Sequence, residues 1–205
     1  MNLKQRWKAL LENAGIDTKK AKNDFQVLRS HYRESHRRYH TLDHIEAMLG
    51  LMDEYRNVIE KPIPFELGIW FHDVIYQPSG VDNEEESALL AERLMREWNL
   101  DPETIHLATE YIRSTSGHFP RIDSFDCNLF LDFDLAILGS EEKMYEKYQR
   151  GIRKEYDIYN DEFYYPARKK VLNAFLTRER IFFTDLMHQR FESTARANIK
   201  KETGG

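Results

Sequence analysis

The chain has 205 residues, which is enough for one substantial domain or at most two small ones. Its 41% hydrophobic and 32% charged residues are ordinary for a globular protein, and its formal net charge of −5 argues against general affinity for nucleic acid. A single cysteine, Cys127, excludes an internal disulfide and fits a reducing compartment. No signal peptide is recognisable, and no apolar run approaches the roughly 18 residues that span a bilayer. We therefore expect a cytoplasmic protein without a membrane partner.

Apolar residues recur at helical spacing in the first third of the chain. One helix face is expected to comprise Ala21, Phe25, Leu28 and Tyr32. Thr41 is expected to cap a helix whose apolar stripe consists of Ile45, Met48, Leu49, Met52 and Tyr55. After two prolines, the pattern predicts a short, strongly apolar helix from Phe65 to about Tyr76, which the turn residues 78–80 end.

Helix starts are equally clear in the rest of the chain. Three acidic residues, Glu84 to Glu86, suit the first turn of a helix that opens at Asp82 or Asn83. Asp101 and Pro102 begin a helix that should reach about Ser116. Further helices are predicted over 124–138, from 140, from 160 and over 184–200. No alternation of period two is long enough for a sheet, so the predicted fold is all-α, a single-domain helical bundle.

Within the short apolar helix, the dipeptide His72-Asp73 stands in the segment LGIWFHDVIY. An aspartate is rarely buried unless it is paired or coordinated. Imidazole and carboxylate together suit Mn, Fe, Co, Ni or Zn, while carboxylates alone favour Mg or Ca. The pair therefore predicts a divalent metal site that faces the core.

Two other segments offer partners for this pair. His40 and His44 lie upstream, and a helix that starts at Thr41 favours His44 because it leaves His40 in the approach loop. Asp132 and Asp134 lie downstream, and because they diverge on a helix, only one is expected to reach the same ion. For each residue a structural role is the alternative, since buried histidines are often hydrogen-bonded core residues and an aspartate can cap a helix or pair with an arginine.

These segments resemble the HD-domain superfamily of metal-dependent phosphohydrolases, whose pattern is H…HD…D on a helical bundle. The resemblance extends over most of the chain and is carried by RRYHTLDHIEAML, WFHDVIYQPSGVDNEEESA, LFLDFDLAILG, RKEYDIY, VLNAFLTRERIF and ARANIK. It implies a single HD-type domain over 1–205, with a metal-site core at about 36–139 and helices over 140–201 that complete the bundle. It also implies a metal-ligand set of His44, His72, Asp73 and Asp134, with Asp132 as the alternative last ligand.

The implied activity is hydrolysis of a small phosphorylated substrate, expected to be a nucleotide, by metal-activated water; the cation is Mn, Co, Ni, Fe, Zn or Mg. Asp73 would orient the water as well as ligate, and Glu84 is the candidate general base. The candidate substrate-binding residues are Arg38, His40 and His118. His118 is also the candidate for holding a second ion.

Two other functions stay open at this point. A non-hydrolytic module could bind a nucleotide or metal and regulate a partner, and an oxygenase could use two irons if His118 and another histidine joined the site. The oligomeric state is open as well. Four phenylalanines near the carboxyl end of the chain either complete the core or form the face of a homodimer. They are Phe175, Phe182, Phe183 and Phe191.

Overall fold

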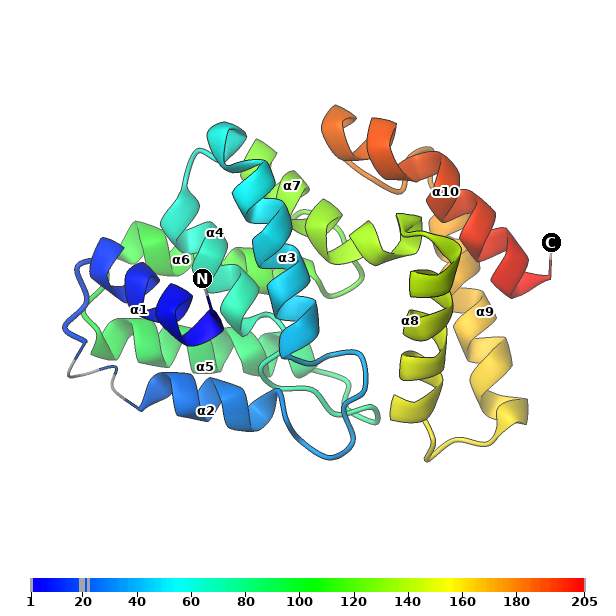
Figure 1. Ribbon diagram of the computed structural model, residues 1–205, viewed down its shortest axis with the longest axis horizontal. Helices are drawn as coiled ribbons and strands as arrows, with labels where there is room; N and C mark the ends of the chain where they lie inside the picture. The colour runs from blue at the N-terminus through cyan, green and yellow to red at the C-terminus, as the bar shows by residue number, and fades with distance from the viewer. Residues whose placement is uncertain (1, 19–20, 22, 205) are drawn as a thin grey trace.

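The computed structural model describes residues 2–18, 21 and 23–204, and this part of the chain folds into helices without a strand (Figure 1). The all-α prediction is confirmed. In chain order the elements are α1 (Leu3–Asn13), α2 (Asp24–His31), α3 (Leu42–Glu54), η1 (Arg56–Val58), α4 (Pro62–Phe71), α5 (Asn83–Glu97), α6 (Pro102–Ser114), α7 (Phe125–Leu135), η2 (Ala136–Gly139), α8 (Glu142–Glu155), α9 (Asp161–Thr177) and α10 (Asp185–Thr203). No helix in the described part of the chain is long and apolar enough to cross a membrane.

Most of the predicted helix starts are confirmed, because they depend on local capping. A side-chain oxygen accepts a hydrogen bond from a backbone N–H in the first turn of α3, α6, α7, α9 and α10. The capping residues are Thr41, Asp101, Ser124, Asn160 and Thr184.

The predicted extent of the fourth helix is wrong at both ends, because α4 runs from Pro62 to Phe71 rather than from Phe65 to near Tyr76, and the two prolines lie in its first turn. Beyond it, the Ser87 hydroxyl accepts a hydrogen bond from the N–H of Ile75 and donates one to its carbonyl. Arg37 donates to the carbonyls of Asp73 and Val74. Tertiary partners thus satisfy backbone groups that a longer helix would have satisfied internally. His72-Asp73 therefore lies at the end of the helix and not within it.

Helix α4 is the centre of the fold, where it contacts α1, α3, α5, α6 and α7. Its residues from Pro64 to Phe71 are all buried.

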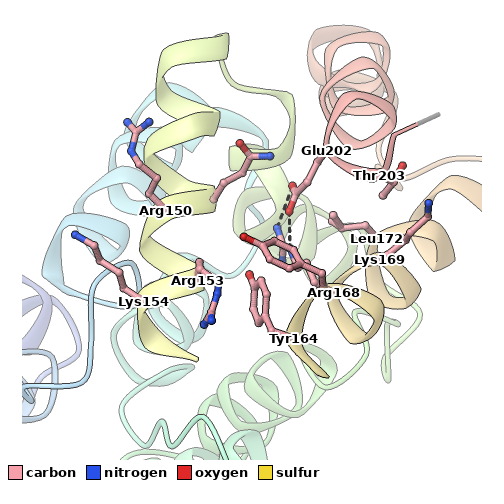
Figure 2. A pocket seen from close by; sticks show the side chains of 11 residues that line it. Arg150, Arg153, Lys154, Tyr164, Arg168, Lys169, Leu172, Glu202 and Thr203 are labelled. Atoms are coloured by element: carbon pink, nitrogen blue, oxygen red, sulfur yellow. Dashed lines mark hydrogen bonds and ion pairs between the residues drawn. The ribbon is translucent and has the colours of Figure 1, made fainter. Parts of the chain in front are cut away.

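Helices α8, α9 and α10 gather on the other side of η2, which α8 and α10 both contact (Figure 1). Of the four phenylalanines expected either to complete the core or to form a homodimer face, Phe175 and Phe182 are buried and belong to the core. A cavity of about 480 Å³ lies between α8, α9 and the end of α10 (Figure 2).

Gly139 allows η2 to approach α10 closely, which makes it a test of this packing. A Cβ at this position would lie 2.6 Å from Cβ and 2.8 Å from the carbonyl oxygen of Phe191. We expect Gly139→Ala to lower the free energy of unfolding by about 1–3 kcal/mol, measured by urea titration, because the added methyl forces η2 and α10 apart. The control is Gly50→Ala in α3, where a Cβ would meet no heavy atom within 4 Å. Equal stability of the two variants would contradict the close approach.

Candidate metal centre

Four side chains from three helices converge at the end of α4. His44 comes from the first turn of α3, His72 and Asp73 from the end of α4, and Asp134 from the last turn of α7. Nε2 of His44 lies 3.1 Å from Nε2 of His72 and 3.1 Å from Oδ1 of Asp134. Oδ2 of Asp73 lies 3.0 Å from Nε2 of His72. We call these four residues the His–Asp cluster.

The spacing of these atoms fits a single divalent cation. Ligand atoms about 2.1 Å from a metal lie about 3.0 Å apart at 90° and about 3.4 Å apart at the tetrahedral angle. The contacts among the four side chains span 3.0–3.8 Å. Ligand atoms of His44, His72 and Asp134 all lie within 4.8 Å of one another, and Oδ2 of Asp73 lies 3.8 Å from His44 and 3.0 Å from His72. Three of the four predicted ligands thus form one group that could hold a metal ion, and a ligand role for Asp73, which contacts both imidazoles but is not part of that group, stays a prediction.

The two imidazoles are held so that Nε2 of each faces the other. Nδ1 of His72 donates to the carbonyl of Ile69 at 3.0 Å, which leaves Nε2 with a free lone pair in the neutral ring. The Tyr39 hydroxyl contacts Nδ1 of His44 at 3.2 Å. The two Nε2 atoms are only 3.1 Å apart, a distance that requires a proton or a metal ion between them. Outer partners of this kind orient metal-bound histidines in proteins.

The electrostatics of the cluster also favour a cation. Burial alone would lower the pKa of His72, but the carboxylate of Asp73 outweighs it and raises the pKa to about 9. Burial alone would raise the pKa of Asp134, yet hydrogen bonds from His118 and His44 hold it well below its usual value. The histidine charge has the same lowering effect on the pKa of Asp73. The site thus keeps two carboxylates ionised, and a metal ion would displace the proton that His72 otherwise carries.

His118 lies beside the cluster, on the far oxygen of Asp134. Its Nε2 is 3.0 Å from Oδ2 of Asp134, while Oδ1 faces His44. The residue has a positive φ of 53° in the loop after α6. Arg178 holds this loop by donating to the carbonyls of Gly117 and His118. His118 therefore lies directly beside the His–Asp cluster, and its predicted contact with a substrate or a second ion stays a prediction.

Asp132 and Glu84 lie outside the cluster. Asp132 is fully buried and accepts hydrogen bonds from the N–H groups of Phe183 and Thr184 and from the Thr184 hydroxyl, so it anchors the start of α10. Of the two aspartates, Asp134 is the one that lies beside His44 and His72. Glu84 is half-buried in the first turn of α5, and no hydrogen bond or ion pair joins it to another described residue. Its role as general base stays a prediction.

Glu155, at the end of α8, is a site residue that sequence reasoning missed. Its buried carboxylate accepts hydrogen bonds from the N–H groups of Arg38, Tyr39 and His40 at 2.6–3.0 Å. Its other oxygen lies 2.7 Å from Nδ1 of His40. The sequence contained a signal, because Glu155 continues the buried stripe of α8, which consists of Tyr145, Tyr148 and Ile152. A glutamate in an apolar stripe requires a partner.

Glu155 holds the loop that carries two of the predicted substrate-binding residues. The ring of His40 packs at a tilt against the ring of Tyr76, with centroids 4.1 Å apart, and lies 6.2 Å from the ring of His44. Burial lowers the pKa of His40, but Asp73 and Glu155 outweigh this effect and raise it. Arg38 is exposed, and its guanidinium donates to the carbonyls of Ser35 and Arg37. A substrate contact by Arg38 stays a prediction.

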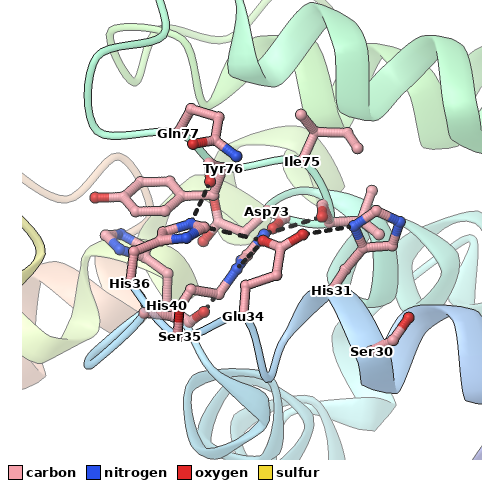
Figure 3. A network of polar contacts seen from close by, with 12 residues as sticks. Ser30, His31, Glu34, Ser35, His36, His40, Asp73, Ile75, Tyr76 and Gln77 are labelled. Carbon is pink, nitrogen blue, oxygen red and sulfur yellow. Dashed lines mark hydrogen bonds and ion pairs between the residues drawn. The ribbon is translucent and has the colours of Figure 1, made fainter.

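The neighbouring Arg37 is buried and supports the structure. It donates to the carbonyls of His40, Asp73 and Val74 and pairs with Glu34 at 3.0 Å. Figure 3 shows Glu34 in a polar network that reaches Tyr76 and Asp73. Arg37 thus ties the loop before α3 to the chain that follows His72. Arg37 is buried, whereas Arg38 is exposed.

Comparisons with known proteins supply no function for this cluster. No family model matches the chain, no curated protein matches its sequence, and no solved structure matches its fold. The resemblance to the HD-domain superfamily therefore stays a prediction from the motifs. What the site does has to follow from the chemistry of its own residues.

Proposed function

We propose that the protein is a metal-dependent phosphohydrolase that acts on a small phosphorylated substrate, with a nucleotide as the preferred class. The observation that carries this proposal is that ligand atoms of His44, His72 and Asp134 lie within 4.8 Å of one another, with Asp73 3.0 Å and 3.8 Å from the two imidazoles. His44 and His72 are buried, whereas Asp73 and Asp134 keep 16% and 13% of their side chains exposed. Substrate and water would therefore approach from the carboxylate side.

His44, His72, Asp73 and Asp134 would hold the cation. When bound, a divalent ion polarises a phosphoryl oxygen and lowers the pKa of a water molecule. Asp73 contributes one oxygen to the cluster, which leaves its second oxygen to orient the attacking water. This role suits its position at the edge of the cluster, where it is ionised.

Positive charge next to the cluster would stabilise the phosphoryl group. His40 carries a raised pKa, lies beside the cluster and is held in place by Glu155. His118 contacts the outer oxygen of Asp134. Each can donate a hydrogen bond to a phosphoryl oxygen or a leaving group, and donors fixed in advance lower the barrier without reorganisation during reaction.

The test is release of phosphate or pyrophosphate from a nucleotide panel by metal-stripped protein, with Mn²⁺, Co²⁺, Ni²⁺ or Mg²⁺ added back. We expect turnover to require the cation and to fall at least about 100-fold in Asp73→Ala, because both a ligand and the water-orienting oxygen are lost. The control is Asp157→Ala, since Asp157 is exposed in the loop after α8. Full activity in Asp73→Ala would overturn the assignment. Metal bound at one equivalent without turnover of any substrate would favour a regulatory binding module.

A further inference from the structure

The cavity between α8, α9 and the end of α10 concentrates positive charge in a chain whose formal net charge is −5. None of the four cluster residues lines it. Its lining residues include a single acid, Glu202, and five cationic residues (Figure 2): Arg150, Arg153, Lys154, Arg168 and Lys169.

Two of these cations are fixed in place. Nε of Arg168 lies 2.9 Å from the Glu202 carboxylate, and its guanidinium packs over the ring of Tyr148. Arg153 pairs with Asp161 at 2.7 Å and covers the ring of Tyr164. Arg153 also donates to the carbonyls of Tyr156 and Tyr159, so the protein holds both guanidinium groups in place and they contribute fixed positive charge to the cavity.

The other three cations carry charge that the protein does not neutralise closely. In the described part of the chain, no ion pair or hydrogen bond reaches the ammonium group of Lys154 or Lys169. Arg150 approaches its nearest carboxylate, on Glu146, only at 3.7 Å. Like charges gathered around a concave surface focus a positive potential, and this attracts an anion of matching size.

The size of the cavity limits what this anion can be. A volume of about 480 Å³ lies within the usual range for sites that bind small molecules. One monovalent anion would leave most of the charge uncompensated, whereas a chain of phosphates can contact several of the cations at once. We propose that the cavity binds a small molecule carrying a di- or triphosphate group, at a site separate from the His–Asp cluster.

The packing around Arg168 separates this site from the metal centre. Tyr148 lies under Arg168, and its ring packs edge-on against Tyr39 with centroids 4.7 Å apart. The hydroxyl of Tyr39 contacts His44. Two aromatic rings thus stand between a phosphate on Arg168 and the cluster, so a ligand there is an effector and not a substrate in position for hydrolysis.

The test is calorimetric binding of inorganic tripolyphosphate, and separately of a nucleoside triphosphate, to the full chain in a chelator at 0.15 M salt. We expect one site per chain. The double variant Lys154→Glu/Lys169→Glu should weaken binding at least about tenfold, because two attractive charges become repulsive. The matched control, Lys143→Glu/Lys147→Glu, makes the same charge change at exposed positions that do not line the cavity.

Other outcomes would overturn the proposal. Equal weakening in the control pair would mean that general electrostatic attraction suffices. Loss of binding in Asp134→Asn would place the ligand at the His–Asp cluster, whereas retained binding there supports a separate site whether or not the protein is a hydrolase. Tighter binding of a single-stranded oligonucleotide than of tripolyphosphate would point to nucleic acid. No binding of either phosphate compound at 1 mM, about the weakest affinity expected of a specific site, would also overturn it.

Discussion

Asp134→Asn is expected to weaken binding of Mn²⁺ to the metal-stripped protein by at least about 100-fold, while Asp132→Asn should leave it nearly unchanged. Asp134 contributes a carboxylate oxygen 3.1 Å from Nε2 of His44. Asp132, two residues earlier, uses both of its oxygens on Phe183 and Thr184. Competition with a chromogenic chelator would measure the two affinities. The same change in side chain at neighbouring positions makes each variant the control for the other.

Asp132→Asn, which should leave metal binding nearly unchanged, should instead lower the free energy of unfolding. Burial raises the pKa of Asp132 to about 6, so at pH 8 this side chain is ionised. The amide of Asp132→Asn has one acceptor oxygen and one NH2 group. The buried N–H of either Phe183 or Thr184 would then face this NH2 group instead of an acceptor. We expect a loss of about 1–3 kcal/mol in the free energy of unfolding, from urea titration at pH 8, because a buried donor loses its acceptor.

Thermal unfolding measures metal binding and stability in the same experiment. A ligand that binds only the folded state raises the melting temperature, so added Mn²⁺ should raise that of Asp132→Asn but not that of Asp134→Asn. The site assignment would be wrong if Asp132→Asn lost the metal-dependent increase while Asp134→Asn kept it.

Glu155→Gln should destabilise the protein by about 2–3 kcal/mol at neutral pH and loosen the loop that carries His40. Burial works against ionisation of Glu155, but hydrogen bonding to His40 and the backbone N–H groups of Arg38 and Tyr39 outweighs it. These contacts lower the pKa of Glu155 from 4.5 to about 2. The neutral amide keeps the shape of the side chain and loses its charge.

The pH dependence gives this prediction a distinct signature. A carboxyl group whose pKa is lower in the folded state stabilises the fold above its unfolded pKa, and the contribution is lost as the pH falls through the folded pKa. The stability gained from Glu155 should therefore be complete above about pH 5 and decline between pH 4.5 and 2. The difference between wild type and Glu155→Gln should fall to roughly half or less at pH 3.

The control for this pH signature is Glu146→Gln, a half-exposed position on the same helix. Urea titrations at pH 7 and pH 3 should show little effect of this change at either pH. A difference between wild type and Glu155→Gln that is equal at pH 7 and pH 3 would mean that the charge of Glu155 does not stabilise the loop.

Local chemistry explains why so much of the helical framework was predictable. A cap such as Asp101 followed by Pro102 satisfies the first backbone N–H groups of its own helix, so the start depends on a few adjacent residues. The all-α class followed from apolar spacing in the same way. The candidate ligands His44, His72 and Asp73 were also recognisable, because a carboxylate in an apolar segment requires a cationic partner or a metal ion to offset its burial.

Only the tertiary structure decided where α4 ends, which aspartate joins the cluster and what Glu155 does. The end of α4 depends on Arg37 and Ser87, which come from elsewhere in the chain. Asp132 and Asp134 have the same chemistry and sequence context, but two residues on a helix differ by about 200° in direction. One therefore faces His44 and the other the start of α10. Apolar spacing specifies which face of a helix is buried, but the neighbour that covers each residue is set only when the helices pack together.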